Sequence, residues 1–295
     1  MQKITHVVAA TDFSAEADLA VQRAALISKS IGATLHILHI VHPLDLYAGS
    51  ELSFNFQMHY QQAQQHSIKK QLTHLQSDLK NTYNIVVETA TRIGRAHVEI
   101  AEYAAAVKAG LIVAGAQGEH SLLEKILGST SSRLIRVAKC HTLIVKNKTT
   151  PITHYQQVIA AVNFSAGAAR ALPLAHTIAP EAHIEALLIF DSNQEAHMHK
   201  AGINEALLVQ YRTQALLEAD NHLAAITAEQ NLGEQISRKI LSGYPPEAIC
   251  NHARSQHADL IVIGKHEKGN IENWLLGSVS KGVAYAATCD VLLTH

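Results

Sequence analysis

Short apolar runs alternate along the chain with longer segments in which apolar residues recur at helical spacing. A short apolar run is typical of a buried strand, and apolar positions three or four residues apart predict an amphipathic helix. In the first half of the chain this pattern predicts strands at 6–10, 34–41, 85–91, 111–115 and 141–146. Between them it predicts helices over 15–31, about 56–80, 97–108 and 129–138.

The second half of the chain repeats the first. The segment 110–145 aligns with 259–294 without a gap. The apolar runs of the second half predict the same series of strands, at 157–162, 183–190, 236–242, 259–264 and 290–294. Pro151 lies in a polar stretch between the copies, where it interrupts any regular element. The sequence therefore predicts two tandem domains, 1–147 and 153–295.

Each copy is expected to form an α/β domain. Strands that alternate with helices favour a parallel sheet with helices on both faces, because each helix carries the chain back to the start of the next strand. In such sheets ligands bind beyond the carboxyl ends of the strands. The loops that follow the strands are therefore the first place to look for a site.

Composition and charge narrow the class of protein. Of the 295 residues, 47% are hydrophobic and 17% are charged, which is ordinary for a globular protein. The formal net charge of −1 gives no indication of a nucleic-acid partner. Three cysteines are too few for a disulfide framework and fit a reducing compartment. No apolar stretch approaches the roughly 20 residues of a membrane helix, so we expect a soluble cytoplasmic protein without a membrane partner.

A glycine-rich loop follows the fourth predicted strand. Gly115 and Gly118 come directly after it, and nine residues later Gly128 opens the next helix. Glycines let backbone N–H groups approach a ligand closely, and a helix start attracts anions. Three hydroxyl residues at that helix start add donors: Ser129, Thr130 and Ser131. The alternative is structural, since glycines end strands and serines cap helices. Neither a dinucleotide-binding G-x-G-x-x-G after the first strand nor a Walker loop is present.

These residues resemble the nucleotide-binding signature of the universal stress protein family, G-x₂-G-x₉-G-[ST]. The segment TDFS at 11–14 also resembles that family's first strand-to-helix turn. The resemblance covers essentially the whole chain, as two Rossmann-like domains in tandem. It implies five-stranded parallel sheets of order 3-2-1-4-5, related by an approximate two-fold axis with the last strands at the interface. It also implies a homodimer of such chains.

The resemblance further implies an adenine nucleotide, usually ATP, with Mg²⁺ a possible companion and AMP or ADP left open. Asp12 would contact the adenosine. The backbone of Ile40 or Val41 would hydrogen-bond the base, and Ala114 and Gly115 would line the base and ribose. The phosphates would be held by Gly118, Gly128, Ser129, Thr130 and Ser131.

The second copy departs from this pattern. Asn163 replaces Asp12, and Glu267 stands where the first copy has Gly118. A carboxylate about 4 Å from a phosphate charge repels it by roughly 1 kcal/mol in water and 4 kcal/mol at an effective dielectric constant of 20. We therefore expect the second copy to have lost its phosphate site, unless Gly269 restores the turn in a shifted register.

Other reactive residues favour structural interpretations. The 20 histidines include no H-E-x-x-H, and His197 and His199 form a lone pair, so no metal site is predicted. Cys140 and Cys289 occupy matching positions, where packing is favoured over a redox role.

No catalytic residue can be assigned from the sequence. Three functions remain open: a nucleotide-binding stress or regulatory protein, a slow ATPase with Asp12 as its acidic candidate, and a nucleotide-free interaction scaffold. The first is the one that the glycine loop and the resemblance favour.

Overall fold

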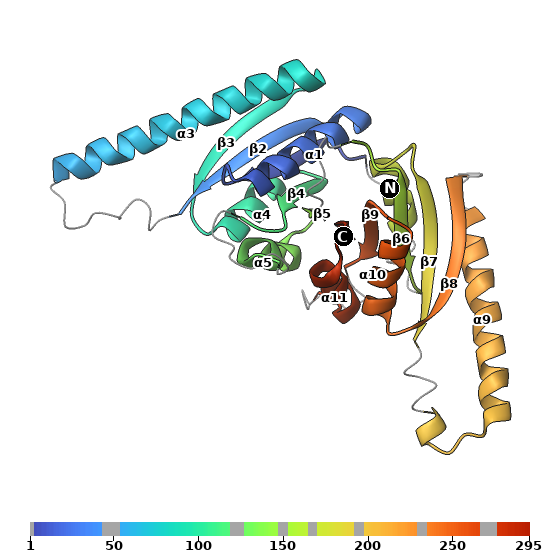
Figure 1. Cartoon of the computed structure of the whole chain (residues 1–295). Coiled ribbons are helices and arrows are strands. Elements are labelled where there is room, and N and C mark those ends of the chain that lie inside the picture. The colour runs from blue at the N-terminus through green and yellow to red at the C-terminus, as the bar shows by residue number, and fades with distance from the viewer. Residues whose placement is uncertain are drawn as a thin grey trace. The chain divides into compact units, whose positions relative to one another are not determined.

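The fold is described from a computed structural model of the chain. It describes residues 3–42, 54–118, 127–146, 153–164, 170–191, 198–228, 235–265 and 276–295, with backbone only for 54–61. The chain divides into two compact units, Gln2–Ile152 and Thr153–His295. We refer to them as the N-terminal unit and the C-terminal unit (Figure 1).

The described part of the N-terminal unit contains five parallel strands. They are β1 (His6–Thr11), β2 (Thr34–Val41), β3 (Val87–Ile93), β4 (Leu111–Gly115) and β5 (His141–Val145). Their order is β3-β2-β1-β4-β5, and each neighbouring pair is parallel. This confirms the predicted order 3-2-1-4-5, with β1 at the centre and the strand order reversing beside it.

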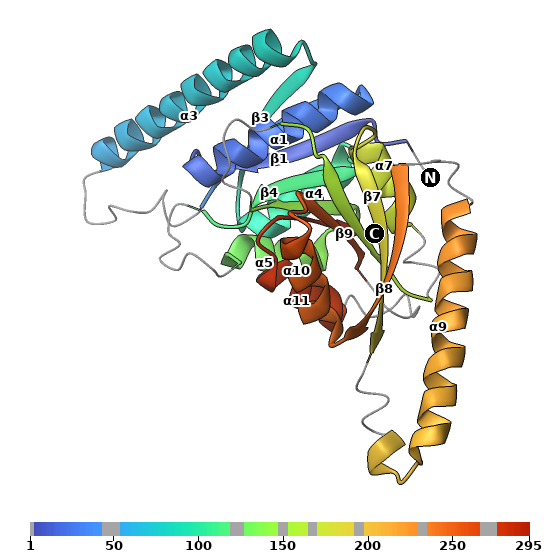
Figure 2. The same cartoon turned by 45° about the vertical axis from the view of Figure 1, so that its right-hand side comes forward.

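Helices cover both faces of this sheet. They are α1 (Ala15–Ile31), α3 (Phe54–Tyr83), α4 (Ala96–Ala106) and α5 (Ser129–Val137). Helix α1 packs on β1, β4 and β5 and contacts α3, whereas α4 contacts α5 and packs on β1 and β2 (Figures 1 and 2). The three-layer arrangement is the one that a parallel sheet with crossover helices requires.

The C-terminal unit has the same strand order in its described part. Its strands are β6 (Gln157–Val162), β7 (His183–Asp191), β8 (Ile236–Gly243), β9 (Leu260–Gly264) and β10 (Asp290–Thr294). They lie in the order β8-β7-β6-β9-β10 and are parallel. Its helices are α7 (Ala171–Ile178), α9 (Glu205–Ala228), α10 (Pro245–Ser255) and α11 (Ser278–Ala286). None of the helices that the structure describes is long and apolar enough to cross a membrane.

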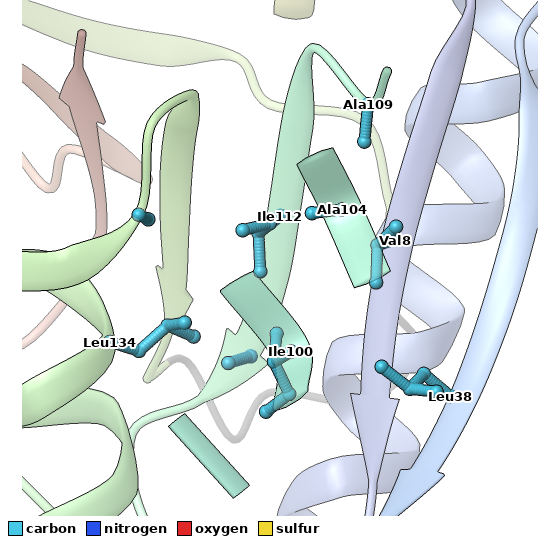
Figure 3. Packing of buried hydrophobic residues seen from close by; sticks show 9 residues of the cluster. Val8, Leu38, Ile100, Ala104, Ala109, Ile112 and Leu134 are labelled. Atoms are coloured by element: carbon cyan, nitrogen blue, oxygen red, sulfur yellow. The ribbon is translucent and has the colours of Figure 1, made fainter. Parts of the chain in front are cut away.

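An apolar cluster fixes the helices that precede and follow β4. Ile100 of α4 and Leu134 of α5 meet Val8 and Ile112 of the sheet, all of them buried (Figure 3). The remaining members are Leu38, Ala104, Ala109, Ala114 and Ala138. Burying one large aliphatic side chain contributes about 1.5–3 kcal/mol. The cluster therefore holds the start of α5 beside the carboxyl end of β4, where the glycine loop begins.

Candidate functional site at the carboxyl edge of the N-terminal sheet

The turn between β1 and α1 places a carboxylate at the carboxyl edge of the sheet. Asp12 follows β1 and is exposed. Its Oδ1 accepts hydrogen bonds from the backbone N–H of Ser14 (3.1 Å) and from the Ser14 hydroxyl (2.5 Å). Ser14 in turn caps α1, because its Oγ accepts from the N–H of Ala17 at 3.2 Å. One oxygen of Asp12 is thus tied to the helix start.

The other oxygen of Asp12 faces the glycine loop. A β-carbon at position 118 would lie 2.6 Å from Asp12 Oδ2. Atoms in real proteins do not approach a β-carbon so closely, so a side chain at position 118 would require the carboxylate to move, and glycine leaves it room. Two parts of the predicted signature, more than 100 residues apart in sequence, therefore meet beyond the ends of β1 and β4, which are neighbouring strands.

Gly115 and Gly128 are packed against backbone. A β-carbon at Gly115 would lie 3.1 Å from the carbonyl oxygens of Gln117 and Glu16, and one at Gly128 would lie 3.2 Å from the carbonyl oxygen of Ala116. The N–H of Gly128 donates to that same carbonyl at 2.7 Å. The bond from Gly128 to Ala116 places the start of α5 next to the end of β4, and Gly115 lets the backbone of α1 approach closely there.

The three hydroxyl residues at the start of α5 lie in different surroundings. Ser131 is buried, and its hydroxyl donates to the carbonyl oxygen of Gly115 at 2.6 Å. Ser129 is exposed and Thr130 is half-buried. Helix α5 begins after Gly128 without a side-chain cap, so no capping side chain satisfies its first N–H groups. Ser131 holds the loop together, and Ser129 and Thr130 remain the hydroxyls available to a ligand.

The predicted base-binding residues lie on strands β2 and β4 of the same sheet, with β1 between these strands. Ile40 and Val41 end β2, and the carbonyl oxygen of Val41 accepts a hydrogen bond from Gly94 at 3.1 Å. The side chain of Ala114 belongs to the apolar cluster under α4 and α5. The Val41 carbonyl is thus already engaged, and the Ala114 side chain packs in the core.

Negative charge accumulates at the β1–α1 turn. Desolvation raises the pKa of the Asp18 carboxyl above its usual value, and the charge of nearby Asp12 raises it further. A second anion beside Asp12 would be disfavoured for the same reason. The Asp12 carboxylate can accept hydrogen bonds from the hydroxyl groups of a sugar but repels phosphates. The N-terminus of α5, with its partial positive charge, attracts phosphates.

The C-terminal unit repeats the loop architecture without the full signature. The Ser280 hydroxyl donates to the carbonyl oxygen of Gly264 at 2.5 Å. The N–H of Gly277 donates to the carbonyl oxygen of Lys265 at 3.0 Å. Each bond lies 149 residues after its counterpart in the N-terminal unit. The serine bond therefore belongs to the architecture of both units. Residues 267 and 269, on which the expected loss of the second site depends, lie outside the described residues.

Phe13 and His39 also lie at the β1–α1 turn and were not predicted from the sequence. Their rings stack with centroids 4.6 Å apart and planes inclined by 25°, beside Asp12. Nδ1 of His39 lies 2.9 Å from the carbonyl oxygen of Thr11. A histidine among the apolar residues of 34–41 was the available signal, but the strand pattern alone does not say what its side chain contacts.

The sequence model of the universal stress protein family matches residues 3–146 and again 154–295. The chain belongs to the universal stress protein family. The Universal stress protein A homolog 1 of Coxiella burnetii is 30% identical over 141 residues, which cover 48% of this chain and 94% of that protein. A universal stress protein of Mycolicibacterium smegmatis is 23% identical over 98% of this chain and 96% of its own length.

A universal stress protein structure from Archaeoglobus fulgidus shares the fold of the whole chain. It superposes with a TM-score of 0.67 at 18% sequence identity and covers 100% of this chain and 99% of its own. The tandem α/β fold and the family membership are therefore established. Domain limits of 1–147 and 153–295 remain our proposal within that frame.

The described part of the chain also contains metal-ligating and thiol side chains. Within the described ranges no group of three histidine, cysteine, aspartate or glutamate side chains is placed to hold a metal ion. Cys140 packs against the apolar cluster, and Cys250 and Cys289 are buried. Among the described residues, the site offers backbone N–H groups, two hydroxyls and the Asp12 carboxylate.

Proposed function

We propose that this universal stress protein binds ATP at the carboxyl edge of the N-terminal sheet and acts as a nucleotide-dependent regulatory protein of the stress response. The observation that carries the proposal is the convergence of Asp12 and Gly118. A β-carbon at Gly118 would lie 2.6 Å from the Asp12 carboxylate. The residue expected to contact the adenosine therefore lies beside a residue expected to bind the phosphates.

Each group has a role that follows from its chemistry. The Asp12 carboxylate accepts hydrogen bonds from ribose hydroxyls, and the backbone at Ile40 and Val41 meets the base. The N–H groups of Gly118 and of the first residues of α5, with the Ser129 and Thr130 hydroxyls, bind the phosphates, and Gly128 shapes the loop beside them. Mg²⁺ would be coordinated mainly by the phosphates and water, since the described residues offer it no cluster of ligands.

The C-terminal unit serves as the structural partner of the N-terminal one in this proposal. It has Asn163 in place of Asp12 and Glu267 in place of Gly118. An amide accepts a weaker hydrogen bond than a carboxylate, and a carboxylate at the phosphate position repels. One nucleotide per chain follows. A homodimer, implied by the family, and a cytoplasmic location, indicated by the cysteine content, are part of the same proposal.

The proposal is tested by titration calorimetry with ATP on two matched variants. Asp12→Ala removes the carboxylate of the N-terminal unit, and Asn163→Ala removes its counterpart in the other unit. Loss of a charge-assisted hydrogen bond, about 1.5–3 kcal/mol, predicts that Asp12→Ala weakens ATP binding by about 10-fold to 150-fold. Asn163→Ala should leave the affinity unchanged. No ATP binding by the wild type, or equal effects of the two variants, would overturn the proposal.

Ligand identity and turnover are separate measurements on the same protein. Nucleotide released on denaturation, identified by chromatography, distinguishes ATP from ADP and AMP. Bound ATP without ADP formation supports a regulatory binding protein. Steady ADP production that Asp12→Ala abolishes would assign the protein to the slow ATPases instead.

A further inference from the structure

The turn that carries Asp12 contains a residue in a conformation that side chains rarely adopt. Phe13 has a φ angle of 64°, in the left-handed region that favours glycine. A bulky residue stays there only where its surroundings hold it, and such residues cluster at functional sites. Phe13 lies between Asp12, which faces the glycine loop, and Ser14, which caps α1. What holds Phe13 therefore also determines where the carboxylate points.

Contacts from β2 and from within the turn hold it. The imidazole of His39 stacks on the Phe13 ring, with centroids 4.6 Å apart. Nδ1 of His39 lies 2.9 Å from the carbonyl oxygen of Thr11, and because a carbonyl only accepts, this nitrogen carries the proton. The N–H of Phe13 donates to Thr11 Oγ1 at 3.0 Å. His39 thus contacts the turn on both sides of Asp12.

We propose that His39 and Phe13 form a clamp that holds the β1–α1 turn and thereby aims the Asp12 carboxylate at the glycine loop. In this account His39 is a positioning residue for nucleotide binding and does not itself touch the nucleotide. The inference rests on the proposed function, because its consequence is read as ATP affinity.

In the C-terminal unit an imidazole from a different element also lies against the turn after the first strand. The imidazole of His222 packs on Phe164 at a centroid distance of 4.9 Å, and its Nε2 lies 3.1 Å from the carbonyl oxygen of Asn163. His222 belongs to α9, whereas the residue of β7 that matches His39 is Leu188. The two arrangements differ in the carbonyl that the imidazole meets, which is that of Thr11 in the N-terminal unit and that of Asn163, the counterpart of Asp12, in the C-terminal unit.

The clamp acts by keeping one conformation of the turn populated. Asp12 Oδ1 is already bonded to Ser14, so the orientation of Oδ2 follows the backbone of the turn. Without the hydrogen bond to Thr11 and the stacked ring, Phe13 leaves the left-handed region for part of the time. The apparent dissociation constant for ATP then rises in inverse proportion to the fraction of molecules in which the turn is aligned.

The experiment is ATP titration calorimetry on the full chain with three single variants and one double variant. His39→Ala removes both contacts and should raise the Kd about tenfold. His39→Asn keeps a side-chain N–H near the position of Nδ1 and should stay within about threefold of wild type. His222→Ala, the matched change in the C-terminal unit, should leave the Kd unchanged. Circular dichroism verifies that each variant is folded.

The double variant separates positioning from simple stabilisation. If His39 acts through Asp12, adding His39→Ala to Asp12→Ala should change the Kd less than twofold, because there is no carboxylate left to aim. A full tenfold additive effect, or a His39→Ala variant that melts at a lower temperature with wild-type affinity, would overturn the inference alone. A wild-type protein that does not bind ATP would overturn the proposed function, and the inference with it.

Discussion

The hydroxyl of Ser131 donates a hydrogen bond to the carbonyl oxygen of Gly115, across 16 residues of sequence and 2.6 Å. Ser280 and Gly264 make the same bond in the C-terminal unit, which lacks the full nucleotide signature. The bond therefore belongs to the fold. It ties the end of the fourth strand to the first turn of the helix that follows the glycine loop.

This relationship predicts opposite effects for two neighbouring serines. Ser131→Ala removes a buried hydrogen bond and should lower the free energy of unfolding of the N-terminal unit by about 1–3 kcal/mol. Ser129→Ala alters an exposed hydroxyl and should leave stability within about 0.5 kcal/mol, while weakening ATP binding several-fold. Urea unfolding and calorimetry measure the two quantities. Reversed results would mean that Ser131 is the phosphate ligand and Ser129 the structural residue.

Substitution of Gly118 should separate crowding from charge. Gly118→Glu copies the residue of the C-terminal unit, and Gly118→Gln has nearly the same size without the charge. Repulsion of about 1–4 kcal/mol between a carboxylate and a phosphate predicts that the glutamate variant binds ATP about 5-fold to 1,000-fold more weakly than the glutamine variant. Both should fold. Equal affinities in the two variants, measured by calorimetry, would place the phosphates elsewhere.

The stability of the N-terminal unit should depend on pH through His36. This side chain is only 2% exposed, and its ring lies 3.0 Å from His6 Nδ1 and 3.2 Å from the Tyr103 hydroxyl. Burial lowers the pKa of His36, with His6 acting in the same direction and Glu88 opposing it. Folding therefore favours the neutral ring. The contribution of His36 to stability is complete above about pH 6.5 and is lost as the pH falls through its lower folded-state pKa.

Urea unfolding between pH 8 and pH 5 tests this dependence. The wild-type protein should lose stability on acidification, and His36→Gln should lose less over the same interval although it is less stable at pH 8. His74→Gln provides the control, because the side chain of His74 is 81% exposed. A His36→Gln variant with the wild-type pH slope would show that other histidines set the acid sensitivity.

Much of the fold could be predicted from the sequence, because the apolar periodicity indicates the strands and helices and the repeat indicates the two domains. Strand order and the placement of most elements were correct. The third strand was not placed correctly: it was predicted at 85–91 and lies at Val87–Ile93. Ile85 and Val86 belong to the apolar run, yet Val86 is 62% exposed, and the polar residues that follow pair with β2. At a sheet edge, backbone pairing decides the strand limits and hydrophobicity does not.

The site was predictable in part for a similar reason. The spacing of the glycines identified Gly115, Gly118 and Gly128, the family resemblance added Asp12, and the structure brings these residues together. Spacing did not distinguish Ser131 from Ser129, because burial depends on how the loop folds back onto β4. It also missed the contact of His39 with the Asp12 turn, since that contact joins two strands and depends on the left-handed conformation of Phe13.

The central claim is that one nucleotide site exists per chain, in the N-terminal unit. The most direct test is the stoichiometry of ATP binding to the purified full chain, measured by calorimetry at saturation. We predict one ATP per chain for the wild type and for Asn163→Ala, and greatly weakened binding for Asp12→Ala. Two ATP molecules per chain, or one that persists undiminished in Asp12→Ala, would contradict the assignment of the site to Asp12 and the Gly115–Gly128 loop.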